Sequence, residues 1–380
     1  MRHMDEDYST ALTLLLLYAL VWFVLPFYAL FSVYILYGAG FGLVGIGALG
    51  SAYNLSSMLG QYSMGRLSDS LRSRRLILLI IVSLMALLNA AVAINPTPTT
   101  YALSVVLMGF LAGGFSSTML AASSELSVVR LGGFISIVRI GGAVGWVVGA
   151  LTIPEIIRGF NLRYSSLIFL GVLASSTALT TIKVRETYRP GFTARLTLGE
   201  WGIFTVYSML AGLAISSASW FLPVYLYVQH GSLTYLGLVI ASGAAAEIPT
   251  MLMAGRLFDN EPIYRRYLFT IDGLALSAAF AAYSLTPLKY IYLAQVVRGV
   301  GYALFIISVP AFIMRLGVKR GLGSAAFYTS FSLGSIIGGL FGGLLSSAVG
   351  IKPLFIILSI IIVSTSASIN LLVLRRFNTA

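Results

Sequence analysis

The sequence predicts an all-α membrane protein with twelve transmembrane helices in two pseudo-symmetric six-helix bundles. Of its 380 residues, 58% are hydrophobic and only 9% are charged, whereas an ordinary soluble domain has about 25% charged residues. Such a chain cannot present a water-soluble surface. It divides instead into about a dozen stretches of the roughly 20 apolar residues that cross a bilayer as a helix. A repeat at half the length of the chain predicts the two bundles.

The apolar stretches place the helices in order along the chain. In the first half we expect spans at residues 12–36, 43–63, 76–94, 101–122, 134–153 and 165–182. In the second half we expect them at residues 203–227, 233–253, 267–285, 290–313, 324–348 and 353–373. The first stretch is too long for the apolar core of a cleavable signal peptide, and Asp5, Glu6 and Asp7 precede it where basic residues are expected. It is therefore predicted to stay as the first span.

Basic residues gather in alternate loops, which orients the predicted helices. The chain has 24 Lys and Arg residues and a formal net charge of +12. Eighteen of the 24 fall on the side that holds both termini. The other six are Arg158, Arg163, Lys289 and Lys352 on the opposite side, and Arg139 and Arg298 inside spans. The positive-inside rule therefore predicts a multi-pass protein of the cell membrane with both termini cytoplasmic, and the excess charge does not indicate a nucleic-acid ligand.

A five-residue segment recurs in an equivalent loop of each half. Residues 65–69 (GRLSD) return as residues 255–259 (GRLFD), 190 positions later. Chance matches of Leu or Gly are common in so biased a composition, but a matched string with an Asp and an Arg is not. Two parallel repeats related by an axis along the membrane normal are therefore predicted. The predicted units are an N-terminal bundle at residues 1–182, a cytoplasmic linker at 183–200 and a C-terminal bundle at 201–380.

The loop after the second span contains a glycine, then an acidic residue, then a basic pair. This pattern resembles the signature loop of the major facilitator superfamily, although Arg72 stands where a glycine is common. The resemblance implies the major facilitator fold and a secondary transporter that works by alternating access. An Asp at a helix end can lock onto an arginine or a helix N-terminus and release it when the bundles rock. The predicted gating residues are Gly65, Asp69, Arg74, Arg75, Gly255, Asp259 and Arg265.

Ionisable side chains inside spans are costly, so each is a candidate for function. Glu125 ends the fourth span and Arg139 lies in the fifth, equally far from the turn at Gly132 and Gly133. An antiparallel hairpin with its apex there would put the two side chains at equal depth, where they can pair or share a substrate. Trp146 follows Arg139 by two turns on the same helix face. The structural alternative is an ion pair beside a tryptophan that packs against lipid.

This region also resembles the lactose permease-like proton symporters. In that group the Arg and the preceding Glu hydrogen-bond a sugar, and the Trp stacks on its ring. Carried over, the resemblance makes Glu125 and Arg139 substrate ligands and Trp146 a platform. Asn54 and Tyr28 are further candidates for a central cavity. A glycine spacing in the same helix is shared with the superfamily's antiporters, but it also serves close helix packing. These glycines are Gly132, Gly141, Gly145 and Gly149.

Three ionisable residues of the second half are candidates for proton coupling. Glu247 lies eight residues before Gly255, about 12 Å from the cytoplasmic end of its helix at 1.5 Å per residue. Desolvation disfavours a charged carboxylate at that depth, so Glu247 is predicted to carry the proton. The eighth helix of the permease relatives also has an essential Glu. Arg298 lies in the tenth span and is predicted as the counter-charge of Glu247 or Asp272. The permease's tenth-helix His and Glu are absent here, so proton coupling is expected to use Glu247, with Asp272 and Arg298, rather than a histidine relay. For Asp272, a structural pairing near the cytoplasmic interface is the alternative.

Several chemistries are excluded by what the chain lacks. It has no Cys and only two His, His3 and His230, so a thiolate site or a His-based membrane enzyme is not expected. There is no phosphate-binding loop of an ATP-driven pump. The prediction is a monomeric proton-coupled secondary transporter, without metal or cofactor, whose partners are a small-molecule substrate, protons and the lipid bilayer. Symport of a small polar solute such as a sugar is preferred. Proton-driven efflux of amphipathic compounds or lipids, and a substrate-sensing receptor on a transporter fold, are the alternatives.

Overall fold

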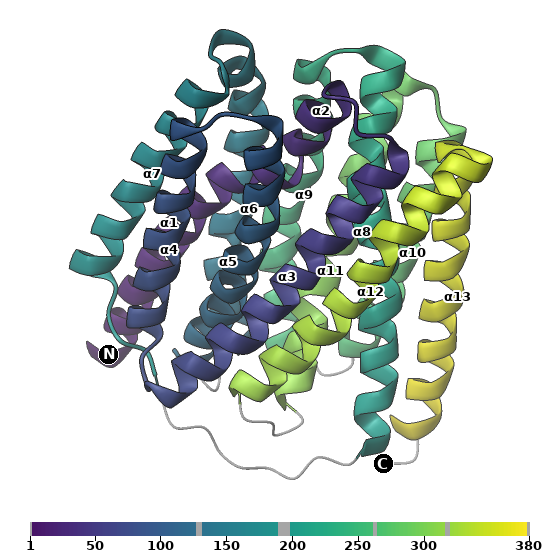
Figure 1. Ribbon diagram of the computed structural model, residues 1–380. Coiled ribbons are helices and arrows are strands. Elements are labelled where there is room, and N and C mark those ends of the chain that lie inside the picture. The colour runs from purple at the N-terminus through teal and green to yellow at the C-terminus, as the bar shows by residue number, and fades with distance from the viewer. Residues whose placement is uncertain (1, 127–130, 189–197, 261–263, 316–319, 378–380) are drawn as a thin grey trace.

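The computed structural model describes residues 2–126, 131–188, 198–260, 264–315 and 320–377, which form helices and contain no strand (Figure 1). Counting α1 and α2 as one span, these residues make twelve spans, and the predicted fold class is confirmed. In chain order the helices are α1 (Arg2–Ala29), α2 (Phe31–Gly38), α3 (Leu43–Ser70), α4 (Arg74–Ile94), α5 (Pro98–Glu125), α6 (Leu131–Gly159), α7 (Leu162–Lys183), α8 (Leu198–His230), α9 (Leu233–Asn260), α10 (Tyr264–Leu285), the short 3₁₀ helix η1 (Leu288–Tyr290), α11 (Ile291–Arg315), α12 (Arg320–Val349) and α13 (Ile351–Phe377).

Most helices are longer than the apolar stretches that predicted them. The helix α3 continues from the predicted end at residue 63 to Ser70, because a helical backbone stays hydrogen-bonded beyond the hydrocarbon core, where its side chains turn polar. The helix α5 begins at Pro98, a residue favoured at the first helical position. Before it, the Thr97 hydroxyl accepts a hydrogen bond from the Thr100 N–H at 3.2 Å. Hydropathy therefore located the spans, and a side-chain cap marks where α4, α5 and α7 begin.

Ten helical segments among the described residues are long and apolar enough to cross a membrane, with α1 and α2 counted together. The apolar part of α10 that the structure describes is shorter, Thr270–Leu285. The helix α3 is not among the ten, because one of its faces is polar. Asn54 and Gln61 on that face contact other helices, whereas Leu55 and Leu59 are exposed on the outside. A polar inner face and an apolar outer face are expected of a span that borders a cavity.

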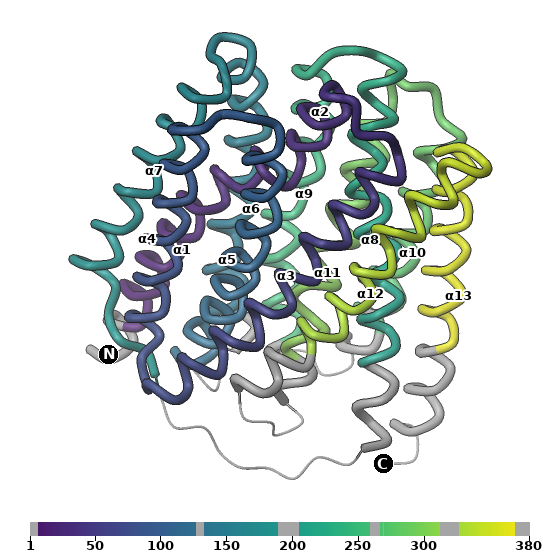
Figure 2. The backbone as a smooth tube through the Cα atoms, in the orientation of Figure 1, coloured from purple at the N-terminus to yellow at the C-terminus, as the bar shows by residue number. Residues whose placement is uncertain are grey.

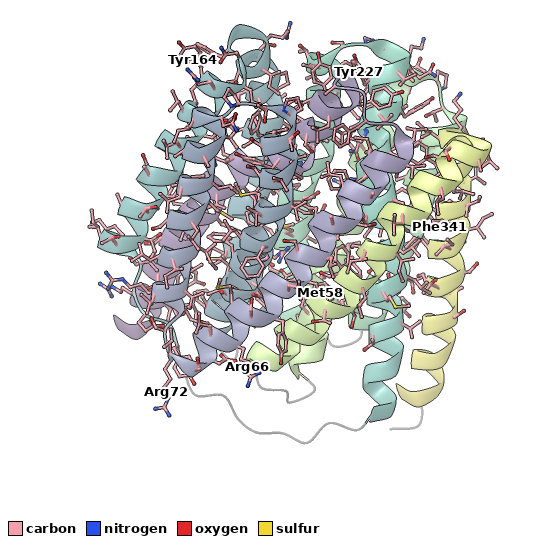
Figure 3. The ribbon with its side chains drawn as sticks, viewed as in Figure 1. Met58, Arg66, Arg72, Tyr164, Tyr227 and Phe341 are labelled. Carbon is pink, nitrogen blue, oxygen red and sulfur yellow. The ribbon has the colours of Figure 1, made fainter. Side chains whose placement is uncertain are left out.

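The two bundles lie side by side, with α1 to α7 in one and α8 to α13 in the other (Figure 1). They meet where α3 packs along α12 and where α6 packs along α9, and the first pair runs obliquely across the front in Figure 2. The start of α1 and the end of α13 lie at one face, here called the terminal face, where Figure 3 also shows Arg66 and Arg72. Tyr164 and Tyr227 lie at the opposite face (Figure 3). The bundle boundaries at residues 182 and 201 stay a prediction.

At the opposite face the bundles touch backbone to backbone. A Cβ on Gly47 of α3 would lie 2.7 Å from the carbonyl oxygen of Gly339 and 3.0 Å from the Cα of Gly343, both on α12. No larger side chain fits there without moving one helix. Beside this contact, the rings of Tyr34 and Tyr227 meet edge to face with centroids 4.9 Å apart. The structure is therefore a conformation in which the two bundles are closed against each other at the opposite face.

The glycine spacing of α6 is explained by packing within the first bundle. Gly141, Gly145 and Gly149 lie against the backbone of α1, as expected where small residues bring helices close, and the surroundings of Gly132 fall outside the described residues. A Cβ on Gly141, Gly145 or Gly149 would lie 2.1, 2.1 or 2.5 Å from the carbonyl oxygen of Leu15, Ala19 or Phe23, respectively. This geometry accounts for the spacing without any reference to antiport.

Candidate functional site

A cavity of about 310 Å³ lies between the two bundles. Residues of α1, α3, α5 and α6 line it on one side, and residues of α8, α9, α10, α11 and α12 line it on the other. Three of the described lining residues are charged, namely Arg139, Glu247 and Arg298. Because charged side chains inside a membrane bundle are costly, their meeting in one cavity makes it the candidate site.

Glu247 and Arg298 form an ion pair at the wall of this cavity. The Arg298 Nη2 lies 2.8 Å from the Glu247 Oε1. The Arg298 Nε donates to the Gln295 side-chain oxygen at 2.6 Å, and the same oxygen accepts a 2.6 Å hydrogen bond from the Tyr283 hydroxyl. The guanidinium also lies over the Tyr302 ring, 5.5 Å from its centroid. Arg298 is therefore the ion-pair partner of Glu247 in this structure, and the role of the pair in proton coupling stays a prediction.

Asp272 lies elsewhere in the second bundle and does not line the cavity. It is fully buried, and its Oδ1 accepts a hydrogen bond from the Tyr207 hydroxyl. In the part of the chain that the structure describes, its Oδ2 has no hydrogen-bond partner. The two alternatives for Arg298 are thus resolved in favour of Glu247, and Asp272 is separate from that pair.

Arg139 reaches the cavity from α6 and bridges the two bundles. Its Nη1 donates to the Tyr328 hydroxyl of α12 at 2.6 Å. Trp146, two turns further along α6, lines the same cavity. A second bridge joins α12 to α3, because the Ser332 hydroxyl donates to the Gln61 side-chain oxygen at 3.0 Å. These two hydrogen bonds are among the polar contacts that join the bundles beside the charged residues.

The predicted pairing of Glu125 with Arg139 is wrong. Both carboxylate oxygens of Glu125 accept from the guanidinium of Arg74, at 2.8 Å from Nη2 and 3.1 Å from Nε. The reason is the helix arrangement: α5 packs mainly against α3 and α4, whereas α6 packs mainly against α1 and α9. Two helices that follow each other in the chain need not face each other across the bundle. Glu125 is 2% exposed and is not among the residues that line the cavity.

Arg74 of the signature loop is the centre of an ionic cluster at the terminal face. Arg74 also contacts Asp69 at 2.7 Å, so one guanidinium holds two carboxylates. Asp69 is 48% exposed, unlike Glu125. Arg75 donates to the backbone oxygen of Thr181 on α7. A contact between an acidic residue and an arginine of the loop is thus present, within the first bundle, and its role in gating stays a prediction. Of the other predicted gating residues, Gly65 and Gly255 lie in α3 and α9, and the side chains of Asp259 and Arg265 fall outside the described residues.

Glu186, which the sequence analysis did not single out, ties the end of the first bundle to the start of α4. It accepts hydrogen bonds from the Arg74 backbone N–H at 2.9 Å and from the Ser73 hydroxyl at 2.5 Å. The Tyr188 ring lies under the same arginine, 5.1 Å from the centroid to Cζ. Partial burial by itself would raise the pKa of Glu186, but the hydrogen bonds from Ser73 and the backbone hold this pKa below its ordinary value. A carboxylate is also favoured at a helix N-terminus.

Replacing Glu186 with Gln should lower stability in a pH-dependent way. Because the native pKa is lowered, the carboxylate contributes stability above its unfolded pKa, about 4.3, and loses it as pH falls through the native pKa. The melting temperature of Glu186→Gln should therefore lie below that of the native protein at pH 7, and the difference should shrink as the pH is lowered below about 4. Melting curves of the purified proteins across this range measure it. A difference that is constant with pH would contradict the assignment.

Asn54 and Tyr28 were both predicted to line a central cavity, and of the two only Asn54 does so. Asn54 lines the cavity and donates from Nδ2 to the Ser216 hydroxyl at 3.0 Å and to the Ser335 carbonyl at 3.2 Å. Tyr28 does not line it, because its ring is fully buried and its hydroxyl donates to the Asn89 side-chain oxygen at 2.9 Å, within the first bundle. Asn54 therefore stays a candidate ligand, and the expectation for Tyr28 is corrected to a packing position.

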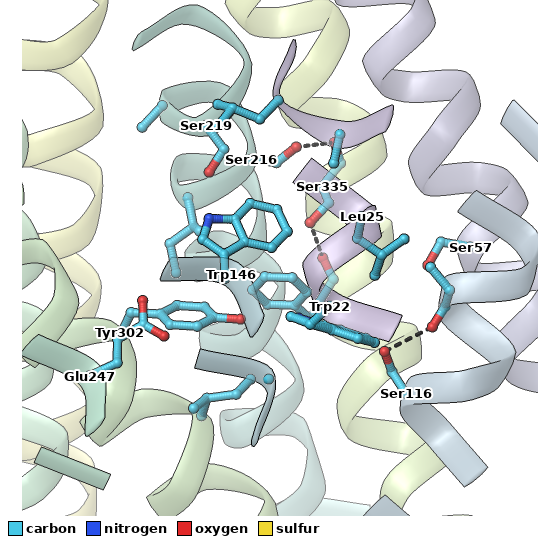
Figure 4. Close-up of a pocket in the computed structure, with 18 of the residues that line it drawn as sticks. Trp22, Leu25, Ser57, Ser116, Trp146, Ser216, Ser219, Glu247, Tyr302 and Ser335 are labelled. Carbon is cyan, nitrogen blue, oxygen red and sulfur yellow. Dashed lines mark hydrogen bonds between the residues drawn. The ribbon is translucent and has the colours of Figure 1, made fainter. Parts of the chain in front are cut away.

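Aromatic rings supply much of the cavity wall, and the sequence analysis missed most of them. Trp22, Trp146 and Tyr302 surround one space, from α1, α6 and α11 respectively (Figure 4). The rings of Trp22 and Tyr18 lie against each other with centroids 4.3 Å apart. Trp220 of α8 also lines the cavity. Aromatic residues are frequent in apolar spans, and nothing in their spacing marks the few that face a cavity.

The sequence as a whole was compared with known families and structures. The profile of the Major Facilitator Superfamily matches residues 10–317 and, in a second match, residues 205–378. The chain belongs to the major facilitator superfamily. The family is one of transporters and not of enzymes, as predicted, and the chain is a multi-pass membrane protein.

Individual relatives in the superfamily are distant. A probable nitrate/nitrite transporter, NarK2 of Mycobacterium tuberculosis, is 28% identical over 251 residues, which are 61% of this chain and 62% of the relative. The crystal structure of the human organic anion transporter MFSD10 (TETRAN) superposes with a TM-score of 0.78 at 15% identity, covering 97% of this chain and all of that one. The nucleoside transporter NupG superposes with a TM-score of 0.69 at 17% identity, covering 95% and 98%. These structures share the fold.

Proposed function

We propose that the chain is a proton-coupled secondary transporter that moves a small polar solute across the cell membrane by alternating access. The observation that carries the proposal is the Glu247 and Arg298 ion pair at the wall of the central cavity. A carboxylate in such a place can be charged when paired and neutral when the pair opens. Proton binding and solute binding would then act on one set of residues. Symport remains our preferred direction of coupling.

The arrangement of the bundles supports alternating access. The cavity lies at the interface of two bundles that touch at the opposite face through Gly47 and α12. Rocking the bundles about this site would expose it to one side at a time. The exposed arginines at the terminal face favour a cytoplasmic location for this face and for both termini. We also propose that the protein acts as a monomer, since each chain contains both halves of the cavity.

Labelling of a single cysteine tests alternating access without a substrate. The chain has no native Cys, and Ser219 lines the cavity from α8 (Figure 4). In oriented vesicles, Ser219→Cys should react with a membrane-impermeant maleimide added from either side. The ratio of the two rates should change between pH 6 and pH 8. Labelling from one side only at both pH values, with the protein shown to be folded, would contradict the proposal.

Export of amphipathic compounds is the second candidate function. The tryptophan and tyrosine rings around the cavity favour it, because they offer apolar surface to a bulky ligand. The names of the relatives state nitrate or nitrite, organic anions and nucleosides as their substrates. Symport and export differ in the direction of the proton gradient that concentrates the solute. Imposing the gradient in each direction on sealed vesicles therefore separates the two.

A further inference from the structure

We infer that the cavity takes a small aromatic anion, whose negative group binds Arg139 and whose ring lies among Trp22, Trp146 and Tyr302. This inference rests on the proposed transport function and names the substrate class for the same site. It follows from the charges that line the cavity, the donors that Arg139 leaves unused, and the rings around it.

The described lining residues carry one more positive charge than negative charge. Glu247 and Arg298 neutralise each other at 2.8 Å. Arg139 is left, and within the described part of the chain its guanidinium forms no salt bridge with a carboxylate; Glu247 is within coulombic range of Arg139 as well, so two arginines share the charge of one carboxylate. The carboxylate that lay nearest to it by sequence reasoning, Glu125, is held by Arg74. A cation in a membrane interior without a counter-charge is costly, so a bound anion would stabilise it.

The free donors of Arg139 match an oxyanion. A guanidinium has five N–H donors in a planar fork, and the protein contact formed by Arg139 in the described residues is the one from Nη1 to the Tyr328 hydroxyl. The remaining donors can hold a carboxylate or sulfonate through two parallel charge-assisted hydrogen bonds. A neutral sugar hydroxyl would satisfy single donors but would leave the charge uncompensated. The geometry therefore favours an anion over a neutral solute.

The surroundings of Arg139 favour a ring on the same ligand. Gly142 lies between Arg139 and Trp146 on α6, and a Cβ there would lie 3.1 Å from the Tyr18 ring and 3.4 Å from the Trp22 ring. The missing side chain lets these two rings approach the α6 backbone and form one wall. Arg139 and Trp146 are separated by seven residues, about 10 Å along the helix. A charged group at one end and an aromatic body about that long fit between them.

A matched pair of ligands tests the inference. Benzenesulfonate and benzenesulfonamide share a ring and a sulfonyl group, but only the first is charged at pH 7. Binding to the purified protein is measured by calorimetry and by tryptophan fluorescence, because three of the four Trp residues line the cavity. We expect benzenesulfonate to bind at least about tenfold more tightly than the sulfonamide, given charge-assisted hydrogen bonds.

Variants of Arg139 test whether this residue causes the preference for the anion. Arg139→Gln should weaken benzenesulfonate binding at least about tenfold and remove the preference for the anion. Arg139→Lys keeps the charge and should keep the preference with weaker binding. Arg139→Lys also tests the role of Arg139 in binding if Arg139→Gln does not fold. Arg163→Gln is the control, since Arg163 is exposed and lies outside the cavity.

Three results would overturn the inference: equal affinity for the two ligands, no binding of either to the native protein, or unchanged benzenesulfonate binding in a folded Arg139→Gln. The labelling of Ser219→Cys uses no ligand. If labelling alternates while the anion fails, the substrate class is wrong and the transport proposal stands. If labelling is confined to one side while the anion binds through Arg139, the transport proposal fails instead.

Discussion

Glu247→Gln should abolish the accumulation of solute driven by a pH gradient while leaving exchange measurable. The amide keeps the shape of the side chain and a hydrogen-bonding oxygen for Arg298, but it cannot bind and release a proton. For every solute that the native protein concentrates in vesicles, the ratio of internal to external solute should fall to about one in the variant. Exchange of labelled for unlabelled solute needs no net proton movement, so it should persist. Uptake with and without an imposed pH gradient measures both quantities.

Asp272→Asn is the matched control for that variant. Asp272 is also a buried carboxylate of the second bundle, but it is bonded to Tyr207 and lies outside the cavity. We expect Asp272→Asn to retain accumulation against the gradient. If Glu247→Gln still concentrates solute at the native rate and Asp272→Asn does not, Asp272 carries the proton and the coupling part of the proposal is wrong.

Glu125→Ala should destabilise the fold by about 3–5 kcal/mol, because it removes one partner of a buried, bidentate ion pair and leaves Arg74 poorly compensated. Asp69→Ala removes a partner of the same arginine, but Asp69 is 48% exposed. Its cost should be about 1 kcal/mol or less, since water replaces an exposed carboxylate cheaply. Denaturant unfolding in detergent micelles measures the free energy of unfolding for both variants.

A double variant tests whether Glu125→Ala is unstable because it leaves the charge of Arg74 unpaired. Glu125→Leu with Arg74→Met replaces both charges by apolar groups of similar size. It should recover most of the stability that Glu125→Ala loses, since a buried pair can be replaced by apolar residues at little cost. Equal losses for Glu125→Ala and Asp69→Ala, or a double variant less stable than Glu125→Ala, would show that burial does not govern this cluster.

The spans and the charged members of the site could be predicted from the sequence, because each has a strong local signal. A stretch such as residues 76–94 is apolar except for Ser83 and Asn89, and α4 covers it and begins only two residues earlier, at Arg74. Arg139, Glu247 and Arg298 stand out because few charges occur inside spans. The repeated loop marked Asp69 and Arg74, which form an ion pair.

Partners across the bundle could not be predicted in the same way. Glu125 and Arg139 are symmetric about a turn, yet Glu125 binds Arg74, 51 residues earlier in the chain. Which helix faces which depends on packing between segments far apart in sequence, and one sequence gives little information on it. Tyr328 was missed for a related reason. A tyrosine costs little free energy in an apolar span, so its presence there does not mark it as functional. Only the structure reveals its contact with Arg139.

The polar inner face of α3 has a consequence for how the protein is made. In the finished structure, Asn54 bonds to Ser216 and Gln61 bonds to Ser332, which are 162 and 271 residues later in the chain. These partners have not been synthesised when α3 reaches the membrane, and polar residues make insertion of a lone segment unfavourable. We therefore expect α3 to enter the bilayer together with its neighbours α4 and α5, and to depend on them until α8 and α12 arrive. Truncation after α3 should therefore leave it poorly inserted, whereas truncation after α5 should restore its insertion, and glycosylation sites placed at its ends would report the difference during translation.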